Sequence, residues 1–192
     1  MLVERYSGGK LRPMSDTTHP SLRRVLLAAA VVAVADMLDA IIVWVVIYQR
    51  STVQRIFQSV ATGLLGPESF KGGAATAALG LVLHCVVALG WTLVFFFLLR
   101  SWPWLRRTTA STRGAVLAGL AYGVVVWLLM DGVVLPLSHA RVTPVSQPWF
   151  WIQLATHPFV VGLPIALILG RGSRSASVVE APVARQAASG TR

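Results

Sequence analysis

Four long apolar runs dominate the sequence and decide what it can fold into. They are Val25–Ile47, Ala74–Leu99, Ala115–Leu135 and Trp149–Leu169. Each run is long enough to cross a bilayer, since a spanning helix needs about 20 apolar residues to cover about 30 Å of hydrocarbon. Only 12% of the residues are charged, whereas soluble domains carry about 25%. The sequence therefore predicts an all-α fold, a four-helix transmembrane bundle.

The segments outside these runs predict a simple domain organisation. Residues 1–24 form a basic N-terminal tail, and residues 25–170 hold the four-helix membrane domain. Residues 171–192 are rich in Ser, Ala and Arg and show no apolar periodicity. That composition is typical of disorder, because it offers little apolar surface to bury. We therefore expect one membrane domain between two tails and no separate soluble domain.

The basic residues alternate in density between the two sides of the predicted bundle. Thirteen of the 17 Lys and Arg residues fall in the two tails or between the second and third runs. The four on the opposite side are Arg50, Arg55, Lys71 and Arg141. The positive-inside rule then places both termini in the cytoplasm. Insertion and anionic headgroups account for the net charge of +10, so we expect the lipid bilayer, and not nucleic acid, as the partner.

The connection between the first and second runs predicts a short amphipathic helix on the outer membrane surface. Between Ser51 and Phe70, apolar residues recur at helical spacing, with Arg and Gln residues between them. This pattern is typical of a helix that lies in the membrane interface. Gly66 and Pro67 should end it, because Gly adopts positive φ readily and Pro cannot continue a helix.

Five ionisable residues interrupt the apolar runs and form the candidate site. They are Asp36, Asp39, His84, Asp131 and His157. A charged Asp at the centre of a spanning helix costs about 2.5–3.5 kcal/mol, so such residues almost always face the interior of a bundle. Asp36 and Asp39 share a helix face beside small Ala residues, which allow close helix approach. We therefore predict that both aspartates face other helices.

Three residues of the fourth run support this candidate site. Gln153 lies four residues before His157 and shares its helix face. Pro158 and Pro164 have no N–H, so each frees a carbonyl in the preceding turn. Within a bilayer such a carbonyl needs a partner or a cavity.

The depth of the five ionisable residues allows them to meet in one half of the bundle. With a rise of about 1.5 Å per residue, all five lie about 6–16 Å below the outer ends of their runs. We expect foremost a structural or regulatory bundle held by an intramembrane Asp/His network. The alternative is a small proton or cation carrier, with a divalent metal as a further option, that uses Asp36, Asp39, His84 and His157. In either case a homo-oligomer or another membrane protein could be a partner.

Motifs for enzymatic chemistry are missing from the sequence. It contains no Gly-x-Ser-x-Gly elbow, phosphate-binding loop, His-Glu-x-x-His motif or paired Cys motif. We therefore expect no enzymatic activity and no cofactor. Cys85 is the single cysteine, which excludes an intrachain disulfide and predicts a small buried thiol in the second span.

Three stretches carry a resemblance to a known type of protein. They are Ala61–Leu89 (ATGLLGPESFKGGAATAALGLVLHCVVAL), Tyr122–Ser138 (YGVVVWLLMDGVVLPLS) and His157–Leu167 (HPFVVGLPIAL). The chain resembles a family of short, four-span bacterial inner-membrane proteins with no assigned biochemical function. The resemblance implies a bacterial cytoplasmic membrane as the location, and it transfers no catalytic or binding residue.

Overall fold

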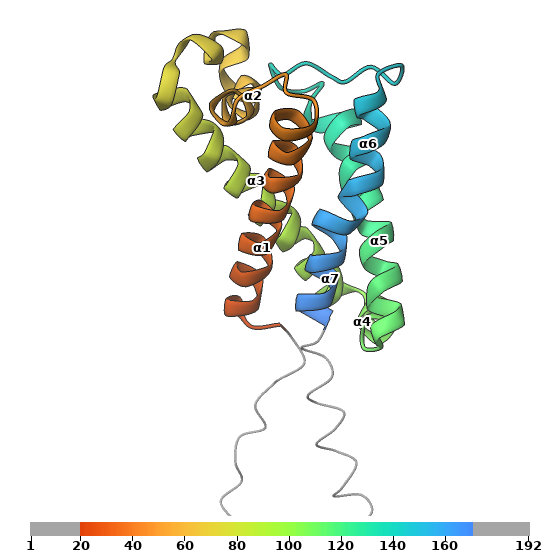
Figure 1. The fold of residues 1–192 in the computed structure, drawn as a ribbon. Coiled ribbons are helices and arrows are strands. Elements are labelled where there is room, and N and C mark those ends of the chain that lie inside the picture. Colours follow the sequence, from red (N-terminus) through yellow and green to blue (C-terminus); the bar gives the residue numbers. More distant parts are fainter. Residues whose placement is uncertain (1–19, 171–192) are drawn as a thin grey trace, which may run out of the picture.

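The computed structural model describes residues 20–170 and is all-α in that range. Four helices are long and apolar enough to cross a membrane, namely Leu22–Ile47, Gly73–Ser101, Thr112–Val134 and Pro148–Gly170. The predicted four-helix transmembrane bundle is confirmed, and the chain is a membrane protein. Figure 1 shows the first described helix beginning and the last one ending at the same end of the bundle, here called the terminal end.

Within residues 20–170 the chain follows eleven helical segments. The first span is α1 (Leu22–Ile41) with η1 (Ile42–Ile47), followed by α2 (Val53–Leu65) and η2 (Gly66–Lys71). The second span is α3 (Gly73–Ser101), followed by α4 (Pro103–Thr109). The third is α5 (Thr112–Leu129) with η3 (Met130–Val134), and the fourth is α6 (Pro148–His157), η4 (Pro158–Gly162) and α7 (Leu163–Gly170).

The predicted domain boundaries differ slightly from the observed helix ends. Helix α1 begins at Leu22, so it includes three residues that the sequence assigned to the basic tail. Ser21 is its N-cap residue, with extended backbone and no side-chain cap hydrogen bond. Residues 1–19 and the whole predicted C-terminal tail, 171–192, lie outside the described residues.

Three of the four spans contain a short π-helical segment. In η1 and η3 the wider turn is visible in its hydrogen bonds, since Tyr48 N–H donates to the Val43 carbonyl at 2.9 Å and Leu135 N–H to the Met130 carbonyl at 2.8 Å. The third segment, η4, begins at Pro158, which has no N–H to donate. Such local widening is frequent at functional sites, and η4 directly follows His157.

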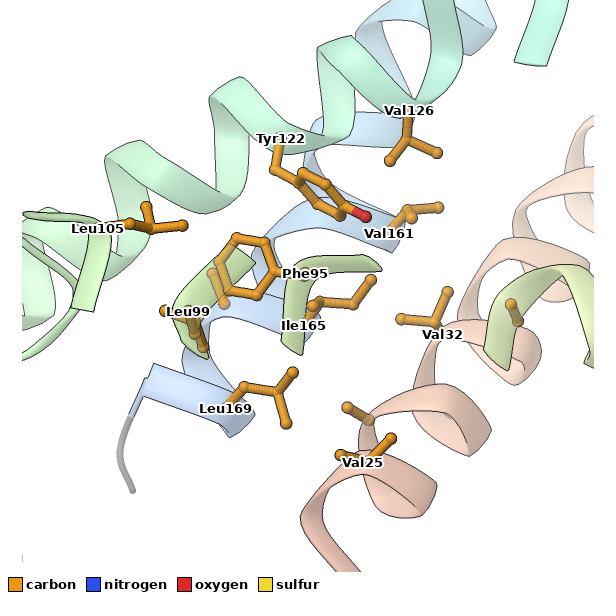
Figure 2. Packing of buried hydrophobic residues seen from close by; sticks show 13 residues of the cluster. Val25, Val32, Phe95, Leu99, Leu105, Tyr122, Val126, Val161, Ile165 and Leu169 are labelled. Atoms are coloured by element: carbon orange, nitrogen blue, oxygen red, sulfur yellow. The ribbon is translucent and has the colours of Figure 1, made fainter. Parts of the chain in front are cut away.

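The apolar core lies toward the terminal end and joins all four spans. Figure 2 shows its side chains converging from α1, α3, α5 and the η4–α7 helix. The rings of Phe95 and Tyr122 pack with centroids 4.8 Å apart, and the Tyr122 hydroxyl donates to the Trp91 carbonyl at 2.6 Å. Ile165 and Leu169 are fully buried beside them. This packing fixes α3 and α5 against the fourth span.

Glycines let the third and fourth spans approach at backbone distance. A Cβ added at Gly123 would lie 2.7 Å from the His157 carbonyl oxygen, and one at Gly119 would lie 2.9 Å from the Gly162 carbonyl oxygen. These positions are the Gly-xxx-Gly pair of the third run, and small residues at this spacing are common where membrane helices pack. The close contact brings His157 and Pro158 into a fixed position relative to α5.

Helix α2 is the predicted amphipathic helix, and it packs against α3 at the end of the bundle opposite the termini (Figure 1). This end is called the α2 end. The buried Gln58 amide donates to the Gly73 carbonyl at 3.0 Å and to the Thr76 hydroxyl at 3.2 Å. Gly80 lies against the backbone of Phe57, where no Cβ would fit. Gly66 ends α2 with φ 63°, as the sequence predicted.

Two sequence expectations need amendment. The short helix α4 at the terminal end was not predicted, because its seven residues carry too little periodicity to identify it. Cys85 was predicted to be buried, but its side chain is exposed on α3. Cys85 follows the largely buried His84 in the sequence, but it lies on the exposed side of α3.

Candidate functional site

Asp36 lies between the two predicted histidines. Its carboxylate is 3.9 Å from Nδ1 of His84 on α3 and 3.8 Å from Nε2 of His157 at the end of α6. The three side chains are largely buried, with 25%, 11% and 15% of their surfaces exposed in that order. Both separations exceed the range of a direct hydrogen bond. The three groups therefore face one another without direct bonds.

Backbone carbonyls fix which nitrogen of each histidine carries a proton. Nε2 of His84 lies 2.9 Å from the Ala33 carbonyl oxygen, and Nδ1 of His157 lies 3.1 Å from the Gln153 carbonyl oxygen. A carbonyl oxygen only accepts, so each of these nitrogens must donate. In the neutral ring the other nitrogen is then an acceptor. Both of those acceptor nitrogens face Asp36.

The result is a cluster of acceptors with no donor among them. Each carboxylate oxygen of Asp36 lies within 4 Å of one of these nitrogens, Oδ2 at 3.9 Å from Nδ1 of His84 and Oδ1 at 3.8 Å from Nε2 of His157. We call these four atoms the acceptor cluster. Burial of an ionised carboxylate beside unprotonated nitrogens is unfavourable unless a proton or another donor-bearing cation joins them.

Three cavities border Asp36. The arginine cavity, about 470 Å³, is also lined by His84, Arg50 and Arg55. The apolar cavity, about 490 Å³, is lined by both histidines and mostly by apolar side chains. The aspartate cavity, about 200 Å³, is lined by His157 and Asp131. Asp36, at the centre of the acceptor cluster, therefore borders all three cavities.

Asp39 occupies a different environment, although it is only one turn from Asp36. Its carboxylate accepts a hydrogen bond of 3.1 Å from the Thr156 hydroxyl on α6. It lines none of the three cavities that border Asp36. The sequence grouped the two aspartates together, but in the structure Asp36 faces the histidines and Asp39 joins α1 to α6.

The other predicted site residues lie at the edge of this arrangement. Asp131 lines the aspartate cavity, and no hydrogen bond or ion pair joins it to the other four ionisable residues within 20–170. Gln153 lines two of the cavities, and its buried Oε1 has no hydrogen-bond partner among the described residues. Pro158 begins η4, and Pro164 lies in α7 away from all three cavities. Gln153 therefore shares two cavities with Asp36.

The divalent-metal alternative has a specific geometric requirement. A transition-metal site needs at least three His, Cys, Asp or Glu donors at coordination distance. Within residues 20–170 no such group of three is placed to hold a metal ion. The geometry of the acceptor cluster instead suits a ligand that carries its own N–H or O–H donors.

Sequence reasoning missed several residues that shape the site. Thr156 is a polar residue beside His157 at the depth of Asp39, so its position could have identified it. The Ala33 carbonyl gives no sequence signal, because a backbone acceptor exists at every residue. Arg50 and Arg55 were assigned only to the interfacial helix, yet they line a cavity that reaches Asp36.

Comparison with known proteins identifies no relative of the chain. No protein-family model, curated protein or solved structure matches the chain. The acceptor cluster and the cavities that border it are therefore the features that indicate a function.

Proposed function

We propose that this membrane protein is a carrier for protons or small monovalent cations, with Asp36 as the binding residue and His84 and His157 beside it. The single observation that carries the proposal is the convergence of acceptor atoms around Asp36, with 3.8 and 3.9 Å left between them. Those gaps are too long for direct bonds and leave room for a shared donor. An intramembrane acid in such a setting is by default a candidate functional residue.

The surroundings of Asp36 support a carrier over a purely structural network. A packing network should be dry and directly hydrogen-bonded, whereas Asp36 borders three cavities. The charged and titratable groups around it come from several elements. They are His84 on α3, His157 on α6, Asp39 on its own helix, Asp131 in η3, and Arg50 and Arg55 along the arginine cavity.

The proposed setting is a bacterial cytoplasmic membrane with both termini in the cytoplasm. The distribution of Lys and Arg supports this orientation by the positive-inside rule. In this orientation the α2 end faces outward, and the arginine cavity, which Asp36 also lines, lies toward that side. Access to the cytoplasmic side would require the apolar core to open, as alternating access demands.

Proton flux into liposomes tests the proposal directly. The full chain is reconstituted with a trapped pH-sensitive dye, and a potassium gradient with valinomycin drives proton entry. Wild-type protein should acidify the lumen faster than protein-free liposomes, and Asp36→Asn should remove this difference. Asp39→Asn is the matched control, because it changes the same residue type one turn away without touching the cavities. Equal proton flux from wild type and Asp36→Asn contradicts the role of Asp36, and no proton flux above protein-free liposomes contradicts a proton carrier.

One specific observation supports a structural role for a neighbouring residue. The hydrogen bond from Thr156 to Asp39 joins α1 to α6 directly. We propose that Asp39 stabilises the bundle and that Asp36 binds the cation. The two functions expected from the sequence would then belong to different aspartates of one helix.

A further inference from the structure

We infer that the cation bound at Asp36 is the ammonium group of a lipophilic amine whose hydrocarbon chain occupies the apolar cavity. This inference rests on the proposed function and names the substrate class of the same site. It follows from the apolar cavity, from the acceptor cluster in its wall and from the positions of the arginines.

The apolar cavity has the size and lining of a small-molecule site. Its volume of about 490 Å³ falls within the range of about 300–1,000 Å³ that is usual for such sites. Apolar side chains from α1, α2, α3, α5 and η4 line it, among them Val32, Val60, Leu83, Val87, Val126 and Val161. Asp36, His84 and His157 are its ionisable lining residues. A ligand that fills it must be mostly hydrocarbon with a small polar head.

The acceptor cluster determines the chemistry of that head. The two oxygens of Asp36 and the two facing histidine nitrogens can only accept when the rings are neutral. A primary ammonium has three N–H donors and a positive charge, so it satisfies these acceptors and neutralises the carboxylate. A quaternary ammonium lacks the donors, an alcohol lacks the charge, and a carboxylate would add a repelled anion.

The arginines and the rim of the apolar cavity favour entry from the lipid. Arg50 and Arg55 line the arginine cavity, and their charges oppose an ammonium that arrives from the aqueous side. The lining of the apolar cavity includes Leu64 and Val134, which are 57% and 38% exposed. In a bilayer such exposed side chains contact lipid, so this cavity reaches the lipid-facing surface. A neutral amine dissolved in hydrocarbon meets no charge there.

When a neutral amine enters the site, one proton transfer converts it into the bound ammonium ion. In the proton-carrying state of the proposed carrier, the amine nitrogen takes the proton from the Asp36 carboxyl, so one N–H bond forms and one O–H bond breaks. The products are an ammonium ion and the Asp36 carboxylate, and the net charge of the site does not change. Release of the ammonium to water and uptake of a new proton by Asp36 would exchange one proton for one cation.

Binding of radiolabelled octylamine to the full chain in nanodiscs tests the inference, with empty nanodiscs subtracted. We expect saturable binding that unlabelled octylamine displaces. Methylammonium, octan-1-ol and octyltrimethylammonium should each compete at least about tenfold more weakly, since each lacks the chain, the charge or the N–H donors. Asp36→Asn should raise the Kd by about tenfold to a hundredfold, and Asp39→Asn should leave it nearly unchanged.

A cavity-filling variant separates this inference from the proposed function. Val87→Trp places a large ring in the apolar cavity, while Val86→Trp, its matched control, adds the same ring on the lipid-facing side, where Val86 is 58% exposed. Val87→Trp should abolish octylamine binding and retain proton flux. Equal competition by methylammonium, or octylamine binding that survives both Val87→Trp and Asp36→Asn, overturns the inference. Proton flux that depends on Asp36 without saturable octylamine binding overturns it too, and leaves the carrier proposal standing.

Discussion

His84 donates its Nε2–H to the Ala33 carbonyl across the α1–α3 contact, at 2.9 Å, three residues before Asp36 on the same helix. This bond orients the ring so that its other nitrogen faces the Asp36 carboxylate. One backbone acceptor on α1 therefore sets both the tautomer of His84 and the position of its ring relative to the Asp36 carboxylate.

Removal of this ring should destabilise the bundle modestly. We expect His84→Ala to lower the free energy of unfolding by about 1 kcal/mol, since hydrogen bonds between membrane helices average about 0.6 kcal/mol and some packing is also lost. Reversible unfolding in mixed micelles measures this change. Cys85→Ala is the control on the same helix, and its exposed side chain should contribute little. Equal losses for the two variants would contradict a special role for the His84 bond.

A double-mutant cycle should reveal the contact between Asp39 and Thr156. We expect Asp39→Ala and Thr156→Val, each of which removes the hydrogen bond, to destabilise the protein with a coupling energy of about 0.6 kcal/mol and at most about 1.7 kcal/mol. The physical reason is the 3.1 Å hydrogen bond that both side chains share. The four unfolding free energies of the cycle are measured under one set of conditions, and strict additivity would show that the bond contributes nothing.

The contact between α5 and the fourth span should not tolerate a methyl group. Gly123→Ala would place its Cβ 2.7 Å from the His157 carbonyl oxygen, so backbone must shift at a cost of about 1–3 kcal/mol. Gly90→Ala in α3 is the matched control, because no heavy atom lies within 4 Å of the added Cβ. Thermal unfolding of the two variants in one detergent compares them. Similar midpoints would mean that the two spans are not closely packed.

Topology can be checked by reporter fusions at two connections. Fusions after Arg55 and after Arg107 should report opposite compartments, with Arg107 in the cytoplasm. The physical reason is that an intact span, α3, separates the two positions, and the basic residues cluster on the Arg107 side. Alkaline phosphatase and green fluorescent protein fusions serve as paired reporters, because each is active on one side only. The same compartment for both positions would contradict the four-span topology.

The sequence by itself determined the features that depend on local pattern. The four spans follow from the length of each apolar run, and α2 follows from apolar residues at helical spacing, because both properties reside in contiguous residues. The turn at Gly66 follows from the ability of glycine to adopt positive φ. These features are specified within each segment and do not depend on contacts between helices.

Only the tertiary structure decided which aspartate faces the histidines. Asp36 and Asp39 lie three residues apart and so differ by about 60° around the helix, which both leaves them on one face and allows different neighbours. The separation of their roles depends on the rotation of α1 and on the tilt of α3. Contacts between elements fix these positions: the His84 ring bonds the Ala33 carbonyl of α1, Gly80 of α3 lies against Phe57 of α2, and Gly123 of α5 lies against Pro158 of η4. Such contacts join residues far apart in the chain, and no local pattern specifies which partner each glycine will meet.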